Sequence, residues 1–329
     1  MDSSSDMSTS TAAAKPPGIA LVFPGMSSSG YADLAKFVMV NPRARRLREA
    51  ADSVLEYPLM EKYRSAGEGY SEYSQVAFLI SCFALAEWAQ EELGIEPDLC
   101  SGASFGEKVA IAFAGSLTFS DAVRLTVQLA RCEEAYFRLE YQDVVTLSVA
   151  RIPGGSLREI LANMADRGEW TDISCFIDDD LFMVSMREQS LEKFNGAVRA
   201  VGGIPLRVMR PPTHSSAFSA LRQRVADNVL TDFRFADPRL PIIADQDGSV
   251  IDTAEGVKSL LLNSIVQPVN WPDTLRSLRK RGVAKIYIAG PDALFGRVRG
   301  ATRDFDVVNI NQRMALRPKR PPKYVERGP

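Results

Sequence analysis

Histidine is nearly absent from this sequence: His214 is the single histidine among 329 residues. Any reaction that uses an imidazole as its base must therefore depend on His214. Cysteine is also scarce, and the four cysteines are widely spaced among apolar or amphipathic residues, which favours buried thiols in a reducing cytoplasm over disulfides or a metal site. These cysteines are Cys82, Cys100, Cys132 and Cys175.

Long apolar runs and an excess of one charge are missing as well. No apolar run is long enough to span a bilayer, and Glu, Arg or Gly interrupts the longest candidates. The 39 Lys and Arg residues nearly balance the 41 Asp and Glu residues, so the formal net charge of −2 gives no reason to expect a nucleic-acid partner. Residues 1–17 are rich in Ser, Thr and Ala without a hydrophobic core, which predicts a disordered arm rather than a secretory signal. We therefore expect a cytoplasmic globular protein without a membrane segment.

One short stretch carries a chemical motif. Gly102, Ser104 and Gly106 form a Gly-x-Ser-x-Gly pattern at the head of an apolar helical run over 109–114. Small residues around a serine are typical of a strand that turns sharply into a helix, which exposes the hydroxyl and directs backbone N–H groups at whatever the serine attacks. Taken alone, the pattern also fits a glycine-tightened turn with an incidental serine, so its meaning depends on the rest of the chain.

The chain before residue 144 and after residue 209 has the pattern of an α/β domain. Residues 18–23 form a short, fully apolar run that ends at Pro24-Gly25, as expected for a buried strand of a parallel sheet. Helical periodicity and further strand-like runs accompany it. The predicted helices are 31–55, 75–93, 120–141, 253–264 and 271–281, and the further predicted strands are 240–244 and 283–289.

Residues 144–209 have a different order of predicted strands and helices, the βαββαβ order of a ferredoxin-like module. Its predicted strands are 144–151, 172–177, 181–186 and 204–209, and its predicted helices are 156–167 and 190–201. We therefore predict an α/β fold in which 18–143 and 210–312 form a large hydrolase-like three-layer α/β catalytic domain and 144–209 an inserted, small ferredoxin-like subdomain. The basic, Pro-rich end, 313–329, predicts an extended tail.

Six short motifs stand in order along the chain. They are Phe23-Pro24-Gly25, Gly102-x-Ser104-x-Gly106-Glu107, Asp121-Ala122-Val123-Arg124-Leu125, Thr213-His214-Ser215, Gln267-Pro268-Val269-x-Trp271 and Gly290-Pro291. Together they resemble the motifs of the malonyl-CoA:acyl-carrier-protein transacylases and of the acyltransferase domains of polyketide synthases. The resemblance covers residues 18–311, nearly the whole chain, and an ordered series is far more specific than the serine pattern alone.

The resemblance implies a serine acyltransferase with a Ser–His dyad and no metal. Ser104 would be the nucleophile and His214 the base, and the acyl group would pass through an acyl-serine ester in a ping-pong mechanism. The backbone N–H groups of Phe105 and Met26 would form the oxyanion hole. In this family a backbone carbonyl orients the histidine, and by position that carbonyl belongs to Ser264.

Two departures from the family pattern indicate an acyl group other than malonyl. Relatives that use malonyl groups carry an arginine that pairs with the free carboxylate, and the corresponding position here is Leu129. Arg131 lies about 200° further around the helix, so it cannot replace that arginine. The residue before the nucleophile, usually histidine, is Ala103. Both changes leave a roomier pocket without a carboxylate clamp.

The resemblance therefore implies a discrete acyltransferase of polyketide (macrolactam-like) biosynthesis that moves a non-malonyl group, such as an aminoacyl or dipeptidyl unit, between acyl carrier proteins. The acyl group would arrive on the phosphopantetheine of a carrier protein, with no bound cofactor. Phe218 would line the pocket together with Ala103 and Leu129. Asp178 and Asp179 could meet an amino group of the acyl chain, although the same acids also fit a solvated hairpin turn.

A basic docking surface is expected because carrier proteins are acidic. The candidates lie on the small module and on a helix predicted after Gly290-Pro291. They are Arg151, Arg207, Arg210, Arg297 and Arg299.

Other functions stay open at this point. A hydrolase that clears stalled carrier proteins would use the same site, and a malonyl-CoA:acyl-carrier-protein transacylase would share the family motifs. A conventional α/β-hydrolase esterase places its histidine near the chain end, whereas 115 residues follow His214. A catalytically silent carrier-binding protein would have no reason to keep both Ser104 and His214 in their motifs.

Overall fold

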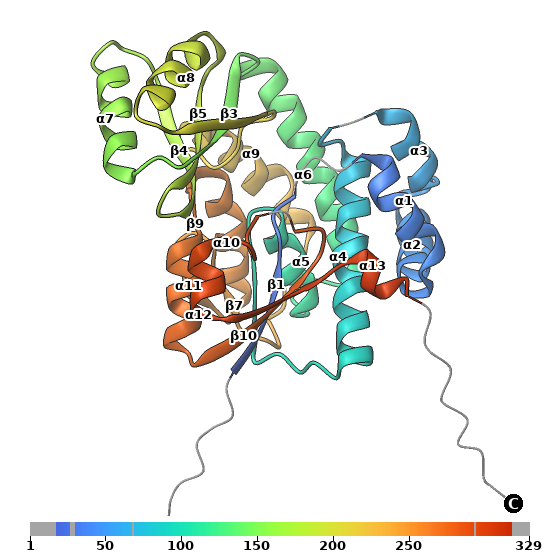
Figure 1. Ribbon diagram of the computed structural model, residues 1–329. Helices are drawn as coiled ribbons and strands as arrows, with labels where there is room; N and C mark the ends of the chain where they lie inside the picture. The colour runs from blue at the N-terminus through green and yellow to red at the C-terminus, as the bar shows by residue number, and fades with distance from the viewer. Residues whose placement is uncertain (1–17, 27–29, 68, 293, 318–329) are drawn as a thin grey trace, which may run out of the picture.

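The computed structural model describes residues 18–26, 30–67, 69–292 and 294–317, and two α/β units are visible in it (Figure 1). The unit formed by 144–209 sits at one end of a larger domain. The predicted N-terminal arm and residues 318–329 of the predicted tail lie outside the described residues. The tail prediction was wrong at its beginning, because residues 313–315 belong to the short helix α13 Gln312–Ala315.

A six-stranded sheet forms the centre of the large domain. Its order is β11-β10-β1-β2-β7-β8; neighbours are parallel except β7 and β8. Leu21 and Phe23 of β1 belong to one buried cluster and Ala20 and Val22 to another, because successive side chains of a strand point to opposite faces. The strands are β1 Gly18–Phe23, β2 Leu99–Gly102, β7 Ile242–Ile243, β8 Val250–Ile251, β10 Val283–Ala289 and β11 Asp306–Ile310.

Helices cover both faces of this sheet, which gives the three layers predicted for the large domain. The larger buried cluster joins one face of the sheet to α4, α5 and α6, and the smaller joins the other face to α11 and α12. The helices are α1 Tyr31–Val40, α2 Pro42–Leu55, α3 Leu59–Ala66, α4 Glu72–Leu93, α5 Gly106–Phe113, α6 Phe119–Glu140, α9 Ser219–Asn228, α10 Ala254–Val266, α11 Trp271–Lys280 and α12 Arg299–Asp304.

The small subdomain has the predicted βαββαβ order, with its own core between the sheet and its two helices. The sheet order is β6-β3-β5-β4-β9, so a fifth strand joins the four that were predicted. That strand, β9, belongs to the large domain and pairs parallel with β4, which ties the two units together. The elements are β3 Val144–Ala150, α7 Gly154–Ala165, β4 Thr171–Asp178, β5 Leu181–Arg187, α8 Leu191–Ala200, β6 Ile204–Met209 and β9 Val269–Asn270.

The helix predicted over 31–55 is in fact two helices that meet at Asn41 and Pro42. Proline favours extended backbone at the residue before it and fits the first turn of a new helix. The Asn41 side chain caps that helix by accepting hydrogen bonds from the backbone N–H groups of Arg43 and Ala44. Asparagine followed by proline was the sequence signal for this break.

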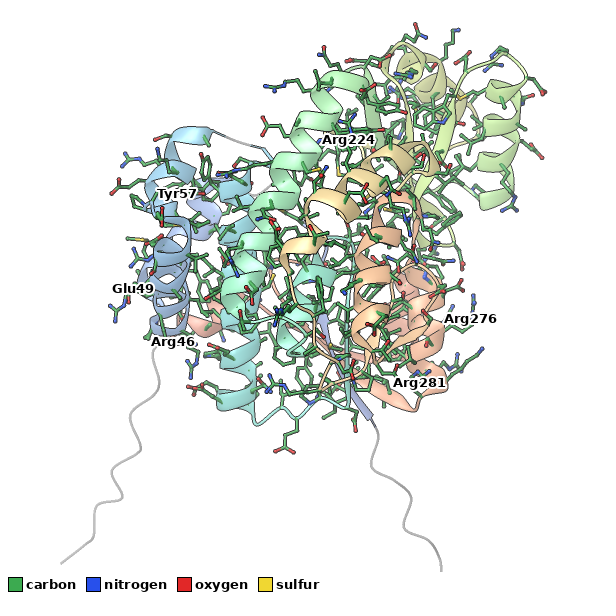
Figure 2. All side chains as sticks on the ribbon, turned by 180° about the vertical axis from the view of Figure 1, so that it is seen from behind. Arg46, Glu49, Tyr57, Arg224, Arg276 and Arg281 are labelled. Atoms are coloured by element: carbon green, nitrogen blue, oxygen red, sulfur yellow. The ribbon has the colours of Figure 1, made fainter. Side chains whose placement is uncertain are left out.

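Charged side chains are spread over the outer helices, as the balanced composition suggests. Arg46 and Glu49 lie on α2, and Arg276 and Arg281 lie on and just after α11 (Figure 2). In the described part of the chain, no helix is both long and apolar enough to cross a membrane. Within the same residues, no cluster of His, Cys, Asp and Glu has the geometry to hold a metal ion.

Candidate active site

The Gly-x-Ser-x-Gly motif forms a tight turn between β2 and α5. A Cβ atom on Gly102 would lie 2.1 Å from the Gly106 carbonyl oxygen, and one on Gly106 would lie 2.2 Å from the Phe23 carbonyl oxygen, so both positions require glycine. Ser104 has a φ of 52°, a left-handed conformation that non-glycine residues rarely adopt. The turn therefore holds the serine in a strained position at the carboxyl end of the central sheet.

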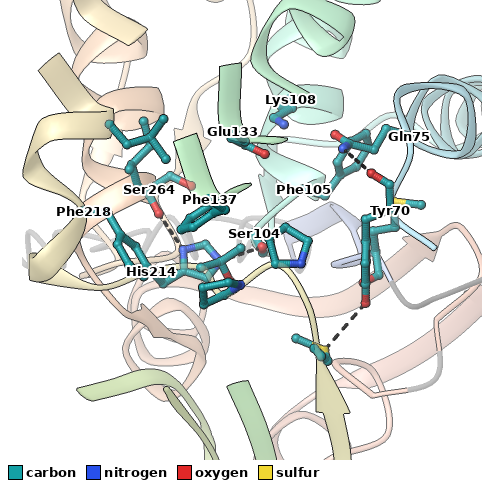
Figure 3. Close-up of a pocket in the computed structure, with 17 residues that line it drawn as sticks. Tyr70, Gln75, Ser104, Phe105, Lys108, Glu133, Phe137, His214, Phe218 and Ser264 are labelled. Atoms are coloured by element: carbon teal, nitrogen blue, oxygen red, sulfur yellow. Dashed lines mark hydrogen bonds between the residues drawn. The ribbon is translucent and has the colours of Figure 1, made fainter. Parts of the chain in front are cut away.

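Ser104 and His214 form a hydrogen-bonded pair. The distance from Ser104 Oγ to His214 Nε2 is 2.7 Å, and His214 Nδ1 lies 2.6 Å from the carbonyl oxygen of Ser264 in α10. Because a carbonyl oxygen accepts only, Nδ1 carries the proton and Nε2 presents its lone pair to the serine hydroxyl. The site thus contains the dyad and the orienting carbonyl that the sequence resemblance implied (Figure 3).

Burial lowers the pKa of His214, whose side chain is 4% exposed. The negative charge of Asp245 and the Ser264 carbonyl raise the pKa, but less than burial lowers it. The imidazole is therefore neutral at pH 7 and can accept a proton.

The loop that carries His214 is anchored from two sides. The backbone N–H of Ser215 donates to the Ile265 carbonyl in α10. On the other side, Asp172 of β4 accepts hydrogen bonds from the Ser215 hydroxyl at 2.7 Å and from the Ser216 backbone N–H at 3.2 Å. The small subdomain therefore helps to fix the loop of His214.

A pocket opens beside Ser104 and His214, and Met26 and Phe105 are on its wall (Figure 3). The assignment of their backbone N–H groups to an oxyanion hole stays a prediction. The wall is mainly apolar, with a few polar groups, as is usual for a site that binds a mixed ligand. Phe218 lines it, in agreement with the prediction. The other lining residues are Tyr70, Gln75, Ser104, Lys108, Glu133, Phe137, Met209, Pro211, Pro212, Thr213, His214, Leu221, Ser264 and Ile265.

Two residues assigned to the pocket from the sequence do not line it. Ala103 is fully buried and packs in the smaller cluster, and Leu129 is 4% exposed within the larger cluster. Counting from the serine identifies a position on the helix but not how deep that position lies. Arg131 is on the surface, where it forms a salt bridge with Glu72 of α4.

The acids of the 178–180 hairpin also lie outside the pocket, which corrects the assignment of Asp178 and Asp179 to it. Asp178 Oδ2 accepts a hydrogen bond from the Arg299 backbone N–H at 2.9 Å, and Asp180 forms a 2.8 Å salt bridge with the Arg299 side chain. The acids therefore connect the small subdomain to the start of α12.

The predicted docking arginines differ in how they are placed. All five are exposed; Arg210 forms a salt bridge with Glu188, and Arg299 forms one with Asp180. Arg297 was expected on a helix together with Arg299, but α12 begins at Arg299 and Arg297 precedes it.

Sequence reasoning missed four residues that bear on the site. Lys108 and Glu133 place opposite charges on the pocket wall, and their spacing from Ser104 and Leu129, one helical turn in each case, was a usable signal. Glu107 and Asp245 are buried carboxyl groups close to Ser104. Glu107 was visible as the end of the serine motif, but nothing in the sequence marked Asp245.

Comparison with known proteins places these features in a family context. The family described as "VinK acyltransferase small domain" matches residues 148–209. The chain is 26% identical over 303 residues to the malonyl CoA-acyl carrier protein transacylase of Bacillus subtilis (strain 168), covering 89% of this chain and 93% of that protein. It is 25% identical to the protein of the same name from Escherichia coli (strain K12), covering 83% of this chain and 88% of that protein.

Solved structures of similar fold include transacylases. A type II polyketide synthase acyl-carrier protein in complex with its malonyl-transacylase contains a chain that matches with a TM-score of 0.79 and 22% identity, over 91% of this chain and 97% of that one. An acyl-carrier-protein S-malonyltransferase from Burkholderia pseudomallei 1710b matches with a TM-score of 0.80 and 19% identity, over 91% and 98%. These likenesses confirm the predicted two-part α/β fold.

The resemblance inferred from the motifs is confirmed. The chain is a relative of the malonyl-CoA:acyl-carrier-protein transacylases over most of its length, and acyltransferase is the enzyme class of these relatives.

Proposed function

We propose that this chain is a cytoplasmic serine acyltransferase of polyketide biosynthesis that moves a non-malonyl acyl group between acyl carrier proteins through an ester on Ser104. The observation that carries the proposal is the hydrogen-bonded series of Ser104 Oγ, the His214 ring and the Ser264 carbonyl beside a pocket. The similarity of the chain to transacylases supports acyl transfer as the reaction.

In the first half-reaction, Ser104 Oγ attacks the carbonyl carbon of an acyl thioester on the phosphopantetheine of a donor carrier. His214 Nε2 takes the serine proton, and the backbone N–H groups of Phe105 and Met26 stabilise the oxyanion. The C–S bond then breaks, and the imidazolium gives its proton to the departing thiol. The acyl group remains on Ser104 as an ester, and no bound cofactor is required.

In the second half-reaction, the thiol of an acceptor carrier replaces the first. His214 takes the thiol proton, the sulfur attacks the ester carbonyl, and the C–O bond to Ser104 breaks as the proton returns to the hydroxyl. Water in place of the thiol would make the same site a hydrolase, so the outcome depends on which acceptor reaches the ester.

The charges around the pocket support an acyl group that is not malonyl. Arg131 is held by Glu72 on the surface, and Leu129 lies in the core, so neither provides a clamp for a carboxylate. Glu133 contributes a carboxylate to the pocket wall, and this charge matches an ammonium group on an aminoacyl or dipeptidyl chain. Glu133 thereby takes the role first assigned to the hairpin acids.

Malonyl transfer is the second candidate function, and one observation favours it. The Lys108 ammonium is also on the pocket wall, four residues after Ser104, where it could pair with the free carboxylate of a malonyl group. The curated relatives named above carry the name malonyl CoA-acyl carrier protein transacylase, which agrees with this alternative.

Carrier proteins are the proposed partners on both sides of the reaction. Arg151 and Arg297 are exposed, and Arg151 is next to Ile152, whose backbone N–H donates to the Asp180 carbonyl beside Arg299. These exposed arginines are the proposed contacts for an acidic carrier, although the acids of the 178–180 hairpin lie beside Arg299. A solved relative of the same fold is a transacylase in complex with its acyl-carrier protein.

Intact-protein mass spectrometry with a panel of acyl carriers tests the choice of acyl group. The protein is incubated with malonyl, simple acyl, aminoacyl and dipeptidyl groups, each on the same carrier, with Ser104→Ala as the control. We expect an adduct from an amino-bearing group that is absent in the variant. A malonyl adduct that Lys108→Met abolishes would instead establish the second candidate.

A further inference from the structure

Two buried carboxyl groups lie close to the nucleophile, and the dyad does not use either one. Asp245 follows β7 and has no exposed surface, and Glu107 is the second residue of α5 and is 2% exposed. Burying one carboxylate without a partner is costly, and burying two adjacent carboxylates costs far more. Their presence beside Ser104 therefore calls for a physical explanation.

The hydrogen bonds of Asp245 connect it to the nucleophile. Asp245 Oδ2 accepts from the backbone N–H of Ser104 at 2.5 Å. The other oxygen, Oδ1, is buried and receives no hydrogen bond from any described residue when both carboxyl groups are ionised. Glu107 hydrogen-bonds to Asp245 if it carries a proton, and its own Oε1 accepts from the Gln246 side chain at 2.9 Å. One shared proton therefore completes the network.

The proton belongs on Glu107 and the charge on Asp245. Burial, and then the charge of Asp245, raise the pKa of Glu107 well above its ordinary value. Burial also raises the pKa of Asp245, but hydrogen bonds from Glu107 and from the Ser104 N–H act in the opposite direction. Glu107 is therefore the better holder of a shared proton, and Asp245, which accepts from the Ser104 N–H, is the better holder of the negative charge.

A negative charge near the dyad can stabilise the imidazolium that forms during the reaction. During acyl transfer His214 becomes an imidazolium, which in Ser–His–Asp enzymes is stabilised by an acid on Nδ1. Here the Ser264 carbonyl occupies Nδ1, and a carbonyl carries no net charge. A negative charge placed in another direction would therefore stabilise the imidazolium further.

We propose that Asp245, with its proton-bearing partner Glu107, is a positioning residue that holds the backbone of Ser104 and supplies the negative charge that balances the imidazolium of His214. In a Ser–His–Asp triad the acid contacts the base, whereas here the acid contacts the backbone of the nucleophile. The catalytic part of this inference rests on the proposed function, whereas the effect on the protonation of His214 does not.

Other charged groups also act on His214, and the test must separate them from Asp245. Glu133 of α6 raises the pKa of His214, and Lys108 of α5 lowers it. Burial, and then the charge of Asp245, raise the pKa of the Cys175 thiol of β4, so that thiol is neutral at pH 7.

Because His214 is the single histidine, its NMR signal reports its titration without ambiguity once any purification tag is removed. We compare the wild-type protein with Asp245→Asn and Glu107→Gln, two near-isosteric variants. Asp245→Asn removes the charge, so we expect the midpoint of the His214 titration to fall by about one pH unit. Glu107→Gln keeps a donor for Asp245 and leaves the charge, so we expect the midpoint to stay or rise. If the two carboxyl groups only support the fold, both substitutions should shift the midpoint of the His214 titration by the same amount.

Equal shifts in the two variants, or no shift in Asp245→Asn, would overturn the proposal. If Asp245→Asn does not fold, the infrared spectrum of the wild-type protein provides the test. We expect a protonated-carboxyl band at pH 7 that is lost in Glu107→Gln. The absence of this band from the wild-type spectrum would contradict the shared proton. Neither measurement uses a substrate, so a failure of acyl transfer is distinguishable from a failure of this inference. The acylation rate of Asp245→Asn, with its pH midpoint shifted in step with the NMR titration, then connects the charge to catalysis.

Discussion

Ser104 Oγ and His214 Nε2 lie 2.7 Å apart although 110 residues separate them in the chain. The inserted subdomain, 144–209, occupies most of that interval, and His214 is on the segment that returns from it to the large domain. Asp172 of the insertion also holds the histidine loop through Ser215. The small subdomain therefore contributes to the geometry of the candidate active site as well as being a candidate docking surface.

The acylation rate should depend on pH through His214. Burial lowers the pKa of this group, so its neutral, active form dominates down to a pH below the value of about 6.5 that an exposed histidine shows. We expect the rising limb of the pH–rate profile to have its midpoint below 6.5. The same shift predicts that protonation favours the unfolded chain, so stability from this group is present above pH 6.5 and is lost as pH falls through the folded pKa. Stopped-flow acylation between pH 5 and 8 provides the test; a midpoint above 7 would contradict the account.

Glu133→Gln should weaken selection for amino-bearing acyl groups. Loss of the carboxylate removes a charge-assisted hydrogen bond to an ammonium group, so we expect kcat/KM for an aminoacyl carrier to fall about tenfold. The rate with an acyl group of equal size but no amine should stay the same. Glu134→Gln is the matched control, because Glu134 is exposed on the same helix and does not line the pocket. Equal losses for both acyl groups would assign Glu133 a role other than recognition.

Reversing the charge of Arg151 and Arg297 together should impair docking of the carrier. Exposed ion pairs are worth little singly, so the double variant with glutamate at both positions is expected to raise the KM for the carrier about tenfold and to leave kcat unchanged. Arg281→Glu is the control, since Arg281 is exposed just after α11, far from the small subdomain (Figure 2). A small acyl thioester without a carrier should react equally with all variants. An unchanged KM for the carrier would mean that the carrier docks on a different surface.

Gly106→Ala should destabilise the turn that holds the nucleophile. Its Cβ would lie 2.2 Å from the backbone oxygen of Phe23, so the elbow must open, at a cost of about 3 kcal/mol or more. Gly155→Ala is the matched control, because its Cβ meets nothing within 4 Å in the helix α7, and we expect a gain of up to about 1 kcal/mol. Urea denaturation of both variants measures the difference; similar midpoints would mean that the elbow is not tightly packed.

The features that could be predicted from the sequence are those encoded by residues close together in the chain. The elbow around Ser104 and the βαββαβ rhythm are each encoded within a short stretch, and the single histidine left no choice of base. The break at Pro42 was also encoded locally, although the periodicity of the whole segment suggested one helix.

Features that depend on distant contacts could not be predicted. The hairpin acids pair with Arg299, about 120 residues away, and are therefore not available to the pocket. Leu129 has the right phase on α6 but lies too deep, since burial is a property of the packed fold. Asp245 lies beside Ser104 in the fold but 141 residues later in the chain, and no sequence motif indicates this contact.

The central claim, a transferable acyl ester on Ser104, is tested most directly by a two-step experiment. The protein is acylated by a donor carrier, freed of that carrier, and then mixed with an unloaded acceptor carrier while mass spectrometry follows both proteins. The account predicts an adduct on the Ser104 peptide that disappears as an equal amount of acyl acceptor forms, and no adduct in Ser104→Ala. An adduct lost to water at the same rate with or without the acceptor would make the protein a hydrolase, and transfer without any adduct on Ser104 would contradict the mechanism.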